Sequence, residues 1–485
     1  MRPSLEEVQG IAGTREYDIC PVCISIPTGD LTPVEVMKKL MNVSSHCFLL
    51  ESAEQTRTWG RYSYLGFDPK LSITCNDGHM AVGDLKIDTD DPARYIRQVL
   101  EDYRSYKPSD FPAFTGGLVG YFSYDYQKYS EPSLGLKAEN SEGFRDVDLM
   151  LFDKVIVFDN KEDCILLIAN VDMKETEVSY NKAAMELEKM RNLVVNGEKR
   201  KDLKGRITSE IRPMFDKERF CSMVEKAKHH IFEGDIFQIV LSNRLEADFE
   251  GSLLPTYSIL RGMNPSPYMF YFSGTDVEVA GASPETLVKL ENGVLHTFPL
   301  AGTRPRGKTE DEDRRLEEEL LADEKELAEH NMLVDLGRND LGKISKFGTV
   351  EVEKYHCIQR FSHVMHIGST VRSEIRDGAD ALDAIDSILP AGTLSGAPKI
   401  RACQLIDEIE GVKRGIYGGA IGYIDFSGNL DTAISIRIAY KKDGKVYVRS
   451  GAGIVADSVP ENEYRESLNK AAAVINALKE SEGEE

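Results

Sequence analysis

The sequence predicts an α+β fold in which antiparallel strands are flanked by helices. In residues 1–193, short runs of β-branched and aromatic residues are separated by Gly, Asp and Asn, which is typical of strands joined by turns. Other segments repeat apolar residues at intervals of three and four, as amphipathic helices do. Near the C-terminus, Ser-Gly-Asn and Asp-Gly turns join strand-like runs and predict β-hairpins.

The first region, expected over residues 1–200, is rich in predicted strands. Helical patterns at 92–106 and 176–193 flank these strands. Residues 194–212 are polar and charged, with little apolar periodicity, so they predict a linker to a second region, 213–485. The predicted strands are, in chain order, FLLES, YSYLGF, LSITC, GGLVGYFSYD, KVIVFD and CILLIA.

The second region begins and ends with a predicted helix. Gly234 and Asp235 separate the first helix from the predicted strand IFQIVLSNR. GAIGYIDF, DTAISIRIAY and KVYVRSGAG then predict a β-meander before the last helix. The apolar stripe of the first helix comprises Phe220, Met223, Val224, Ala227 and Ile231. That of the last helix comprises Tyr464, Leu468, Ala471, Ile475 and Leu478.

Composition narrows the range of functions. The 485 residues carry a formal net charge of −22, which argues against nucleic acid as a partner and against an anionic membrane surface. No run of about 18 apolar residues is present and the first residues lack the apolar core of a signal peptide, so we expect a cytoplasmic protein. Cys20 and Cys23 form a lone CxxC without a second pair at zinc spacing, so we interpret the eight cysteines as reduced structural thiols.

Two glutamate pairs indicate a metal site. Glu326 and Glu329, like Glu463 and Glu466, are three residues apart near a predicted helix start, so each pair shares one helix face. Asp323 is the predicted N-cap of the first of these helices. If the two helix starts face each other, their four carboxylates suit Mg²⁺ better than Zn²⁺. The alternative is solvated surface glutamates, which the helix dipole favours in a first turn.

An arginine and two glycines indicate an anion site. In TAISIRIAY, predicted as one strand, Arg437 shares a face with small residues, which leaves room for a bidentate contact with a ligand carboxylate. A structural salt bridge is the alternative. Gly451 and Gly453 end the last predicted strand and leave bare backbone N–H groups for an anion. The alternative for the glycines is a β-bulge.

Two Gly-Thr turns and a set of acid–base residues complete the pattern. LAGTRPRG (300–307) and PAGTLSGAPK (390–399) place basic residues beside Gly-Thr, but the glycine spacing of the second is not that of an ATP-binding Walker loop. Glu285 ends GASPE, and FSHVMH carries His363 and His366, residue types that suit proton transfer near neutral pH. Structural histidines are the alternative. Together with the glutamates, these residues predict a site for a small substrate with several carboxylates.

The same strings carry a resemblance to a known family. Residues 215–475 resemble the chorismate-utilising enzymes, and the whole chain is similar to the large subunits of anthranilate synthases. The family's order and spacing are kept by GASPE, LAGTRPRG, EHNMLVDLGRND, GTLSGAPK, YGGAIGY, IRIA and GAGIVADS. The resemblance implies a layered αββα sandwich of two largely antiparallel sheets flanked by helices, with intertwined N- and C-terminal parts.

The resemblance also implies roles for individual residues. Glu285 would protonate the departing ring hydroxyl of chorismate, and His366 would act in the later loss of pyruvate. The Mg²⁺ ligands would be two direct and two supporting glutamates, namely Glu329 and Glu466, then Glu326 and Glu463. The residues in contact with chorismate would be Gly302, Thr303, Thr393, Tyr417, Arg437, Gly451, Ala452 and Gly453.

Two positions bear on which member of the family the chain resembles. Gln238, a further residue of the implied catalytic site, stands where the water-adding enzymes carry a general-base lysine, so ammonia is the expected nucleophile. Ala301 stands where aminodeoxychorismate synthases usually carry a lysine. LLES and NPSPYMFYF resemble the family's tryptophan feedback site, which would comprise Ser52, Pro267, Tyr268 and Met269. Without the resemblance, Pro-Tyr-Met is an apolar patch more typical of a core.

These inferences predict a lyase that converts chorismate and ammonia to anthranilate and pyruvate, the first committed step of tryptophan biosynthesis, under feedback by tryptophan. No cysteine lies in a Gly-rich elbow with a histidine partner, so glutamine would serve only through a separate amidotransferase subunit. The alternatives are an aminodeoxychorismate synthase, a catalytically silent tryptophan-binding regulator and a generic Mg²⁺ phosphohydrolase.

Overall fold

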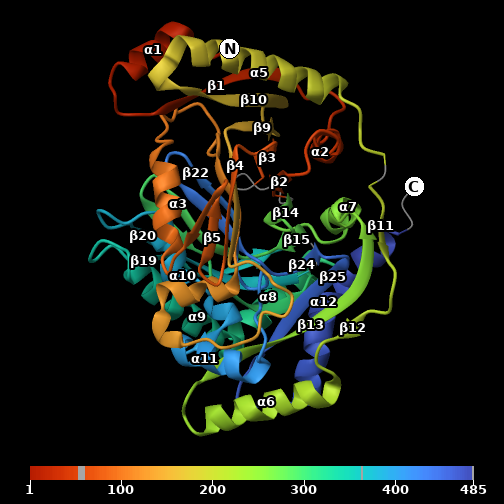
Figure 1. Ribbon diagram of the computed structural model, residues 1–485. Coiled ribbons are helices and arrows are strands. Elements are labelled where there is room, and N and C mark those ends of the chain that lie inside the picture. Colours follow the sequence, from red (N-terminus) through yellow and green to blue (C-terminus); the bar gives the residue numbers. More distant parts are fainter. Residues whose placement is uncertain (53–59, 202, 362–363, 483–485) are drawn as a thin grey trace.

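Two antiparallel β-sheets form the centre of the computed structural model, which describes residues 1–52, 60–201, 203–361 and 364–482 (Figure 1). The first sheet contains, in spatial order, β1 (Ile19–Pro27), β10 (Cys164–Asp172), β9 (Lys154–Asp159), β3 (Tyr62–Phe67), β2 (Cys47–Glu51), β14 (Tyr268–Ser273), β15 (Glu278–Ser283), β24 (Ile438–Lys442), β25 (Lys445–Ile454), β13 (Gln238–Gly251) and β11 (Gly205–Ile207), with β12 (Arg212–Pro213) and β21 (Gly396–Ala397) also paired to β13.

The second sheet has the same antiparallel character. Its strands are, in spatial order, β18 (Leu300–Pro305), β20 (Val364–Glu374), β17 (Val294–Thr297), β16 (Thr286–Glu291), β23 (Leu430–Ile434), β22 (Ala420–Asp425), β7 (Gly117–Phe122), β8 (Val147–Phe152), β4 (Leu71–Asn76), β5 (His79–Val82) and β6 (Leu85–Asp88), with β19 (Glu351–Arg360) paired to β20.

Helices flank the sheets and confirm the α+β class. The α-helices are α1 (Leu5–Ala12), α2 (Pro33–Leu40), α3 (Pro92–Glu101), α4 (Gln127–Ser130), α5 (Thr176–Asn196), α6 (Lys217–Phe232), α7 (Leu254–Met263), α8 (Glu310–Ala322), α9 (Glu324–Gly342), α10 (Ala381–Ile388), α11 (Lys399–Glu410) and α12 (Pro460–Glu480). Short 3₁₀ turns are η1 (Tyr124–Tyr126), η2 (Pro132–Leu134), η3 (Met173–Glu175) and η4 (Gly392–Leu394). No helix in the described ranges is long and apolar enough to cross a membrane.

Both sheets are shared between the N- and C-terminal parts of the chain, so the expected intertwining is confirmed. In the first sheet β2 pairs with β14, with Glu51 opposite Met269. In the second, β7 pairs with β22, with Phe122 opposite Ala420. Between the sheets Phe48 and Phe152 meet edge to face, with ring centroids 4.7 Å apart, in a largely aromatic core. The boundaries near residues 200 and 213 stay predictions, and the expected linker adds β11 and β12 to the first sheet.

The chain passes from one sheet to the other at two neighbouring points. Pro284 and Glu285 connect β15 to β16, and residues 435–437 connect β23 to β24. The prediction of DTAISIRIAY as one strand is therefore wrong, and the expected meander is two hairpins in different sheets. Arg437 takes a left-handed conformation (φ 52°) at this break. Alternating Ile and small residues fit one strand locally, but only a break lets both hairpins join their own sheets.

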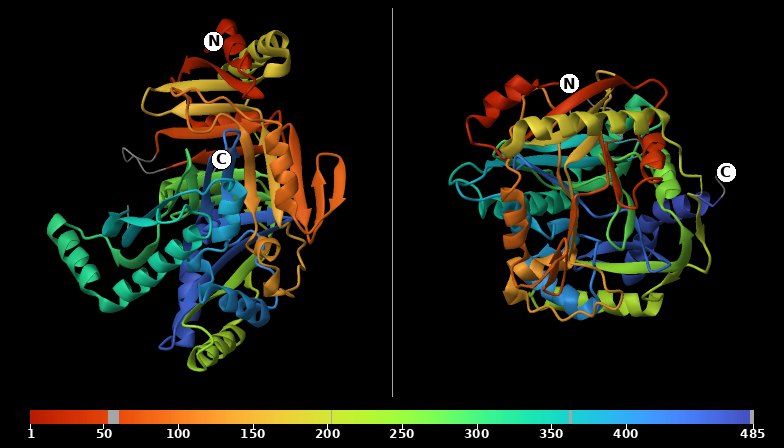
Figure 2. Two further views of the ribbon diagram at one scale, coloured as in Figure 1. Left: turned by 90° about the vertical axis from the view of Figure 1, so that its left-hand side faces the viewer. Right: turned by 45° about the horizontal axis from the view of Figure 1, so that its top comes forward.

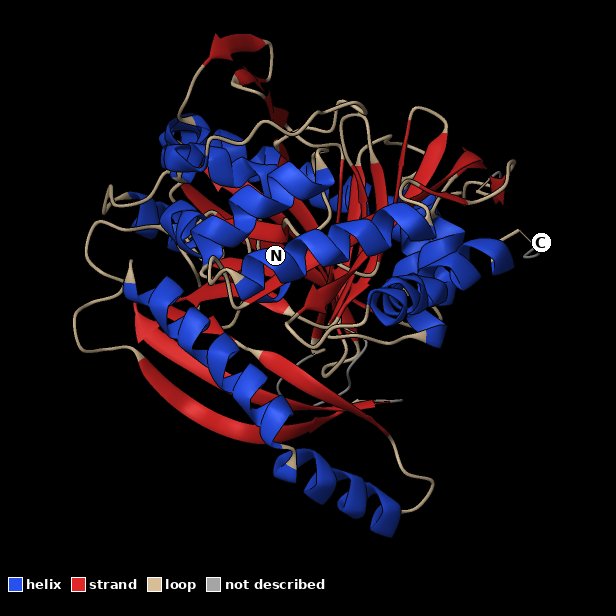
Figure 3. Cartoon of the chain, turned by 90° about the horizontal axis from the view of Figure 1, so that it is seen from below, coloured by secondary structure: helices blue, strands red, loops and turns tan. Residues whose placement is uncertain are grey.

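A third part of the molecule projects from the sheets. Figure 2 shows α8 and α9 extending away from the body, and Figure 3 shows this projecting part from below, with a long helix lying across strands and a second helix beyond it. We call α8, α9 and β18–β20 the arm. Its own core is small and contains Leu320, Met365 and Ile367 as buried residues. Few buried apolar contacts make such a unit less stable locally than the sheets.

Candidate active site

Glu285 lies in the two-residue connection between β15 and β16. The backbone oxygen of Glu285 accepts a hydrogen bond from the Ile434 N–H (3.0 Å), which ties this passage to the end of β23. The Thr393 hydroxyl donates to Glu285 Oε1 (3.0 Å). Burial raises the pKa of Glu285 to about 7, although the Thr393 hydrogen bond and the charge of Arg437 oppose the rise. Near neutral pH the carboxyl can therefore hold a proton and release it.

A small cavity of about 40 Å³ lies beside Glu285 and Thr393 and is also lined by Asp340. This volume is large enough for a water molecule. Lys399, the lysine of the second Gly-Thr turn, donates to Asp340 Oδ2 (2.6 Å) and to the Ile388 carbonyl (2.9 Å). It joins α9, α10 and α11, which agrees with the inference that this turn is not a phosphate loop.

Arg437 lies at the second passage between the sheets, facing Glu285. The backbone oxygen of Arg437 accepts a hydrogen bond from the Ala282 N–H (3.2 Å). Among the described residues its guanidinium makes no hydrogen bond and no ion pair. Burial lowers the pKa of Arg437 from its usual value, and Glu285 opposes this. The alternative of a structural salt bridge is thus not observed, and a partly buried arginine without a partner is free to bind a carboxylate.

His366 lies on β20, close enough to Arg437 to be influenced by its charge. Its Nδ1 lies 2.8 Å from the Gly302 carbonyl and 3.1 Å from the Thr303 hydroxyl. Burial lowers the pKa of His366, and the positive charge of Arg437 lowers it further. The ring is therefore neutral near pH 7, and when Nδ1–H donates to Gly302 the Nε2 atom keeps a lone pair for a proton. His363 lies outside the described residues.

The first Gly-Thr turn, on β18, holds His366 close to the start of α9 within the arm. Gly302 has a φ of 63°, which favours glycine. A Cβ added there would lie 3.0 Å from Leu320 Cδ1 and 3.3 Å from Glu326 Oε2. The glycine thus allows a carboxylate of α9 to approach the turn that holds the histidine.

The two glutamate pairs lie at the starts of α9 and α12. Asp323 is confirmed as the N-cap of α9, because its carboxylate accepts from the N–H groups of Lys325 (3.1 Å) and Glu326 (3.2 Å). Arg304 binds Asp323 (2.9 Å) and lies 3.5 Å from Glu326. On α12, Glu466 pairs with Lys470 at 2.7 Å. Cations thus already lie beside both pairs.

The pairs interact electrostatically across the two helices. Burial raises the pKa of Glu329, and the charges of Glu326 and Glu466 add to the rise. Burial also raises the pKa of Glu463, again with a contribution from Glu466. In the described ranges, however, no three His, Cys, Asp or Glu side chains gather closely enough to hold a metal ion. The helix faces were predicted correctly, whereas the metal ligands themselves stay a prediction.

The end of β25 has one free edge. β24 pairs with β25 only as far as Val448, whereas β13 continues opposite the glycines without a shift in register, so the alternative of a β-bulge is not observed. A Cβ added at Gly451 would lie 3.2 Å from Tyr417 Oη, and one at Gly453 would lie 3.0 Å from Gln238 Nε2. The bare backbone therefore lets Tyr417 and Gln238 approach the strand; Ala452 between the glycines is buried.

The residues expected at the tryptophan site also come together. Met269 pairs with Glu51, which brings Pro267 and Tyr268 beside Ser52. The Ser52 hydroxyl is buried and has no hydrogen-bond partner among the described residues. Tyr268 lies opposite Ser283, and its hydroxyl contacts Asp431 (2.8 Å) and Thr286 (2.9 Å). The residues that follow Ser52, 53–59, lie outside the described part.

Sequence reasoning missed a buried ionic cluster behind this site. Arg414 and Arg449 share the carboxylate of Glu410, and all three side chains are almost completely buried. The only local signal was the spacing of Glu410 and Arg414, which is that of a helical ion pair. Arg449 comes from a distant strand, and nothing in the sequence connects it to the other two.

Comparisons with known proteins identify the family of the chain. The chorismate binding enzyme family matches residues 45–476. Anthranilate synthase component 1 of Acetivibrio thermocellus is 44% identical, and 99% of each chain is covered. The protein of the same name from Aquifex aeolicus is 42% identical, over 99% of this chain and 98% of the relative. The crystal structure of anthranilate synthase component I from Streptococcus pneumoniae superimposes with a TM-score of 0.77 at 37% identity and covers 93% of this chain and 98% of that one.

A match over most of the chain, and relatives above 40% identity over nearly its full length, decide the family. The solved relative has the same fold. The chain therefore belongs to the chorismate-binding enzymes, in the lyase branch of the anthranilate synthase component 1 proteins.

Proposed function

We propose that the chain catalyses the Mg²⁺-dependent conversion of chorismate and ammonia to anthranilate and pyruvate. The observation that supports it best is that Glu285, with a pKa of about 7, and Arg437, which has no hydrogen-bond or ion-pair partner among the described residues, both lie where the chain passes between the sheets. Chorismate presents two carboxylates and a ring hydroxyl that must leave with a proton. An arginine without a partner and a protonated carboxyl suit these two needs.

In this proposal each residue has a distinct task. Arg437 binds the enolpyruvyl carboxylate, and the free edge of β25 offers N–H groups to the substrate. The ammonia nitrogen forms a bond to the ring while the ring C–O bond breaks, and Glu285 gives its proton to the departing hydroxyl, which leaves as water. His366, neutral and with Nε2 free, acts in the later loss of pyruvate.

Mg²⁺ would be held by Glu329 and Glu466, with Glu326 and Glu463 in support. Carboxylate oxygens are the ligands that Mg²⁺ prefers. The pKa values of Glu329 and Glu463 are raised by burial first and then by neighbouring carboxylates, whose repulsion a cation would relieve. When bound, the ion would orient the ring carboxylate. The arm would have to bring α9 closer to α12 for this.

Ammonia would come free from solution or from a separate glutamine amidotransferase subunit. Tryptophan would bind at Ser52 and Pro267–Met269 and inhibit the enzyme. The buried hydroxyl of Ser52, which has no partner within the described part of the chain, offers a hydrogen-bonding group for it. A cytoplasmic location remains part of the proposal.

The experiment is turnover of chorismate with ammonium, with and without Mg²⁺ and tryptophan, with the product identified by mass and fluorescence. Fluorescent anthranilate, dependence on Mg²⁺ and loss of rate with tryptophan are the expected results. A para-substituted amine would identify an aminodeoxychorismate synthase, against which Ala301 argues. Absence of turnover together with tryptophan binding would identify a silent regulator.

A further inference from the structure

The buried cluster of Arg414, Glu410 and Arg449 lies directly behind the active site. Glu410 ends α11, Arg414 follows in the loop after it, and Arg449 stands on β25 two residues before Gly451. Their side chains are 0–1% exposed. Two guanidinium groups share one carboxylate, so the cluster carries a net positive charge. Such a cluster persists only when hydrogen bonds satisfy the remaining donors.

The remaining N–H donors of Arg414 bind the backbone of two segments that border the site, a 3₁₀ turn and a β-strand. Its Nη1 donates to the Leu394 carbonyl (2.6 Å), and its Nη2 donates to the Val240 carbonyl (2.7 Å). Leu394 follows Thr393, whose hydroxyl binds Glu285. Val240 in turn donates its N–H to the Ser395 carbonyl (2.8 Å), so the turn at 393–395 is fixed to β13 from both sides.

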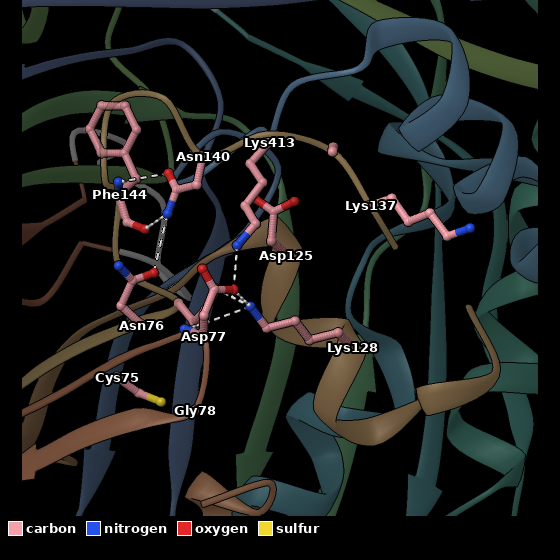
Figure 4. Close-up of polar contacts among 12 residues, drawn as sticks. Cys75, Asn76, Asp77, Gly78, Asp125, Lys128, Lys137, Asn140, Phe144 and Lys413 are labelled. Carbon is pink, nitrogen blue, oxygen red and sulfur yellow. Dashed lines mark hydrogen bonds and ion pairs between the residues drawn. The ribbon is translucent and has the colours of Figure 1, made fainter. Parts of the chain in front are cut away.

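The loop that carries Arg414 is itself held by the N-terminal part of the chain. Lys413 binds Asp77 (2.5 Å), which also accepts from Lys128 (2.6 Å), as Figure 4 shows. On the other side of Arg414, the Gly415 N–H donates to Asp125 Oδ2 (2.7 Å). The guanidinium also lies over the ring of Tyr124, 4.6 Å from its centroid. These contacts hold the loop on both sides of Arg414 and place an aromatic ring against its guanidinium.

We propose that Arg414 is a positioning residue for the proton donor of the reaction: by holding the Leu394 carbonyl against β13, it places the Thr393 hydroxyl on Glu285. This inference rests on the proposed function, in which Glu285 is the general acid. Replacement of Arg414 should therefore act on Glu285 through Thr393, rather than only on the stability of the fold.

Arg449 provides a matched control. It is as buried as Arg414 and binds the same Glu410, but its other donors go to Ser242 Oγ (2.8 Å) and the Lys413 carbonyl (2.9 Å). It makes no contact with the 393–395 turn among the contacts of the described residues. Arg414→Lys and Arg449→Lys keep the charge and lose the same planar fork, so they should destabilise the protein to a similar extent.

The test compares Arg414→Lys, Arg449→Lys, Thr393→Val and the double variant Arg414→Lys/Thr393→Val by kcat, KM and the pH dependence of kcat. We expect Arg414→Lys to lower kcat about 10-fold, with little change in KM, because misplacement removes part of a general-acid contribution of about 10²- to 10⁴-fold. The Thr393 hydroxyl stabilises the charged form of Glu285. Removing or displacing this hydroxyl should therefore raise the pKa of Glu285 and move the basic limb of the pH profile of kcat to higher pH. The kcat of the double variant should be no lower than that of Thr393→Val alone, because both changes act through the same hydroxyl.

Equal losses of kcat in Arg414→Lys and Arg449→Lys, or additive losses in the double variant, would overturn the proposal. If Arg414→Lys does not fold, Tyr124→Leu removes the ring under the guanidinium and should cause the same pH shift to a smaller extent; an unchanged profile would count against Arg414. Glu285→Gln tests the general-acid role of Glu285 separately from the positioning role of Arg414. If it keeps the basic limb, the general-acid assignment fails, independently of what Arg414 does.

Discussion

Two regions of the molecule carry the proposed site residues and differ in how firmly they are held. One is the passage between the two sheets, and the other is the arm. At the passage, Glu285, Thr393 and the backbone beside them are fixed by hydrogen bonds and by the ionic cluster behind them. On the arm, burial raises the pKa of Glu329 at the start of α9, as it raises that of Glu463 on α12, but no three His, Cys, Asp or Glu side chains in the described residues are close enough to hold a metal. In the proposed function, the acid would therefore be held in place in advance, whereas the metal ligands would have to be brought together.

This difference has an energetic reason. A proton donor acts best when its partners are already in place, because they would otherwise have to reorganise at the moment of reaction. Four carboxylates gathered without a cation would repel one another, so an open arm costs less in the absence of metal. A site divided in this way should respond to mutation differently on its two sides.

The largest effect is expected from Glu285→Gln, on the fixed side. We expect kcat to fall by about 10²- to 10⁴-fold, because the amide cannot donate the proton. The wild-type rate should fall as pH rises through about 7, where Glu285 loses its proton, and this basic limb should disappear in the variant. Steady-state anthranilate fluorescence across pH measures both, and a variant within a few-fold of wild type would contradict the role.

The stability of the same variant should change in the opposite direction. The pKa of Glu285 is raised on folding from 4.5 to about 7, so the native state holds this proton more tightly and stability is lost as pH rises through that range. Glu285→Gln removes this loss and should melt at a higher temperature than wild type above pH 7, and at a similar temperature near pH 4. Thermal unfolding at both pH values is the measurement.

A smaller kinetic effect is expected from Arg437→Lys. The charge remains, but the bidentate fork is lost, so kcat/KM should fall by about 10- to 100-fold, mainly through KM. Arg338→Lys, at an exposed position of α9, is the control and should leave kcat and KM unchanged. An unchanged KM for chorismate in Arg437→Lys would exclude the carboxylate contact.

The arm is tested by Glu329→Gln/Glu466→Gln. Mg²⁺ should raise the unfolding temperature of the wild type by mass action and leave that of the double variant unchanged. The exposed pair Glu324→Gln/Glu480→Gln controls for the loss of two charges from the same helices. Equal Mg²⁺ shifts in all three proteins would show that these carboxylates are not the ligands.

The smallest global effect is expected from Leu320→Ala. Loss of a buried leucine costs about 2–5 kcal/mol, but the small separate core of the arm should confine this cost to local opening. Hydrogen exchange should therefore accelerate in α8 and β20, with little change in the main melting transition. Ile434→Ala, in the core of the body, should lower the main transition instead.

The sequence allowed the helices, strands and turns to be predicted better than their arrangement in space. The N-cap at Asp323 and the shared faces of the glutamate pairs follow from local spacing, which helical geometry dictates. The break at Arg437 could not be predicted in this way, because IRIA has the alternation of an ordinary strand. That break depends on which sheet each hairpin joins, which long-range packing decides.

The cluster around Arg414 shows the same limit. Its three charges come from α11, the following loop and β25, so their meeting depends on topology rather than on sequence spacing. Motifs indicated which residue types would do the chemistry. They gave no information on the groups that hold these residues in place.

The pairing of Tyr268 with Ser283 has a thermodynamic consequence. Ser283 is two residues from Glu285, and the Tyr268 hydroxyl touches Thr286 directly after it, so the proposed tryptophan site and the proposed acid are separated by one cross-strand pair. If tryptophan weakens chorismate binding across this pair by some factor, chorismate must weaken tryptophan binding by the same factor, because coupling free energy is reciprocal. Chorismate would then protect its own enzyme from inhibition as it accumulates.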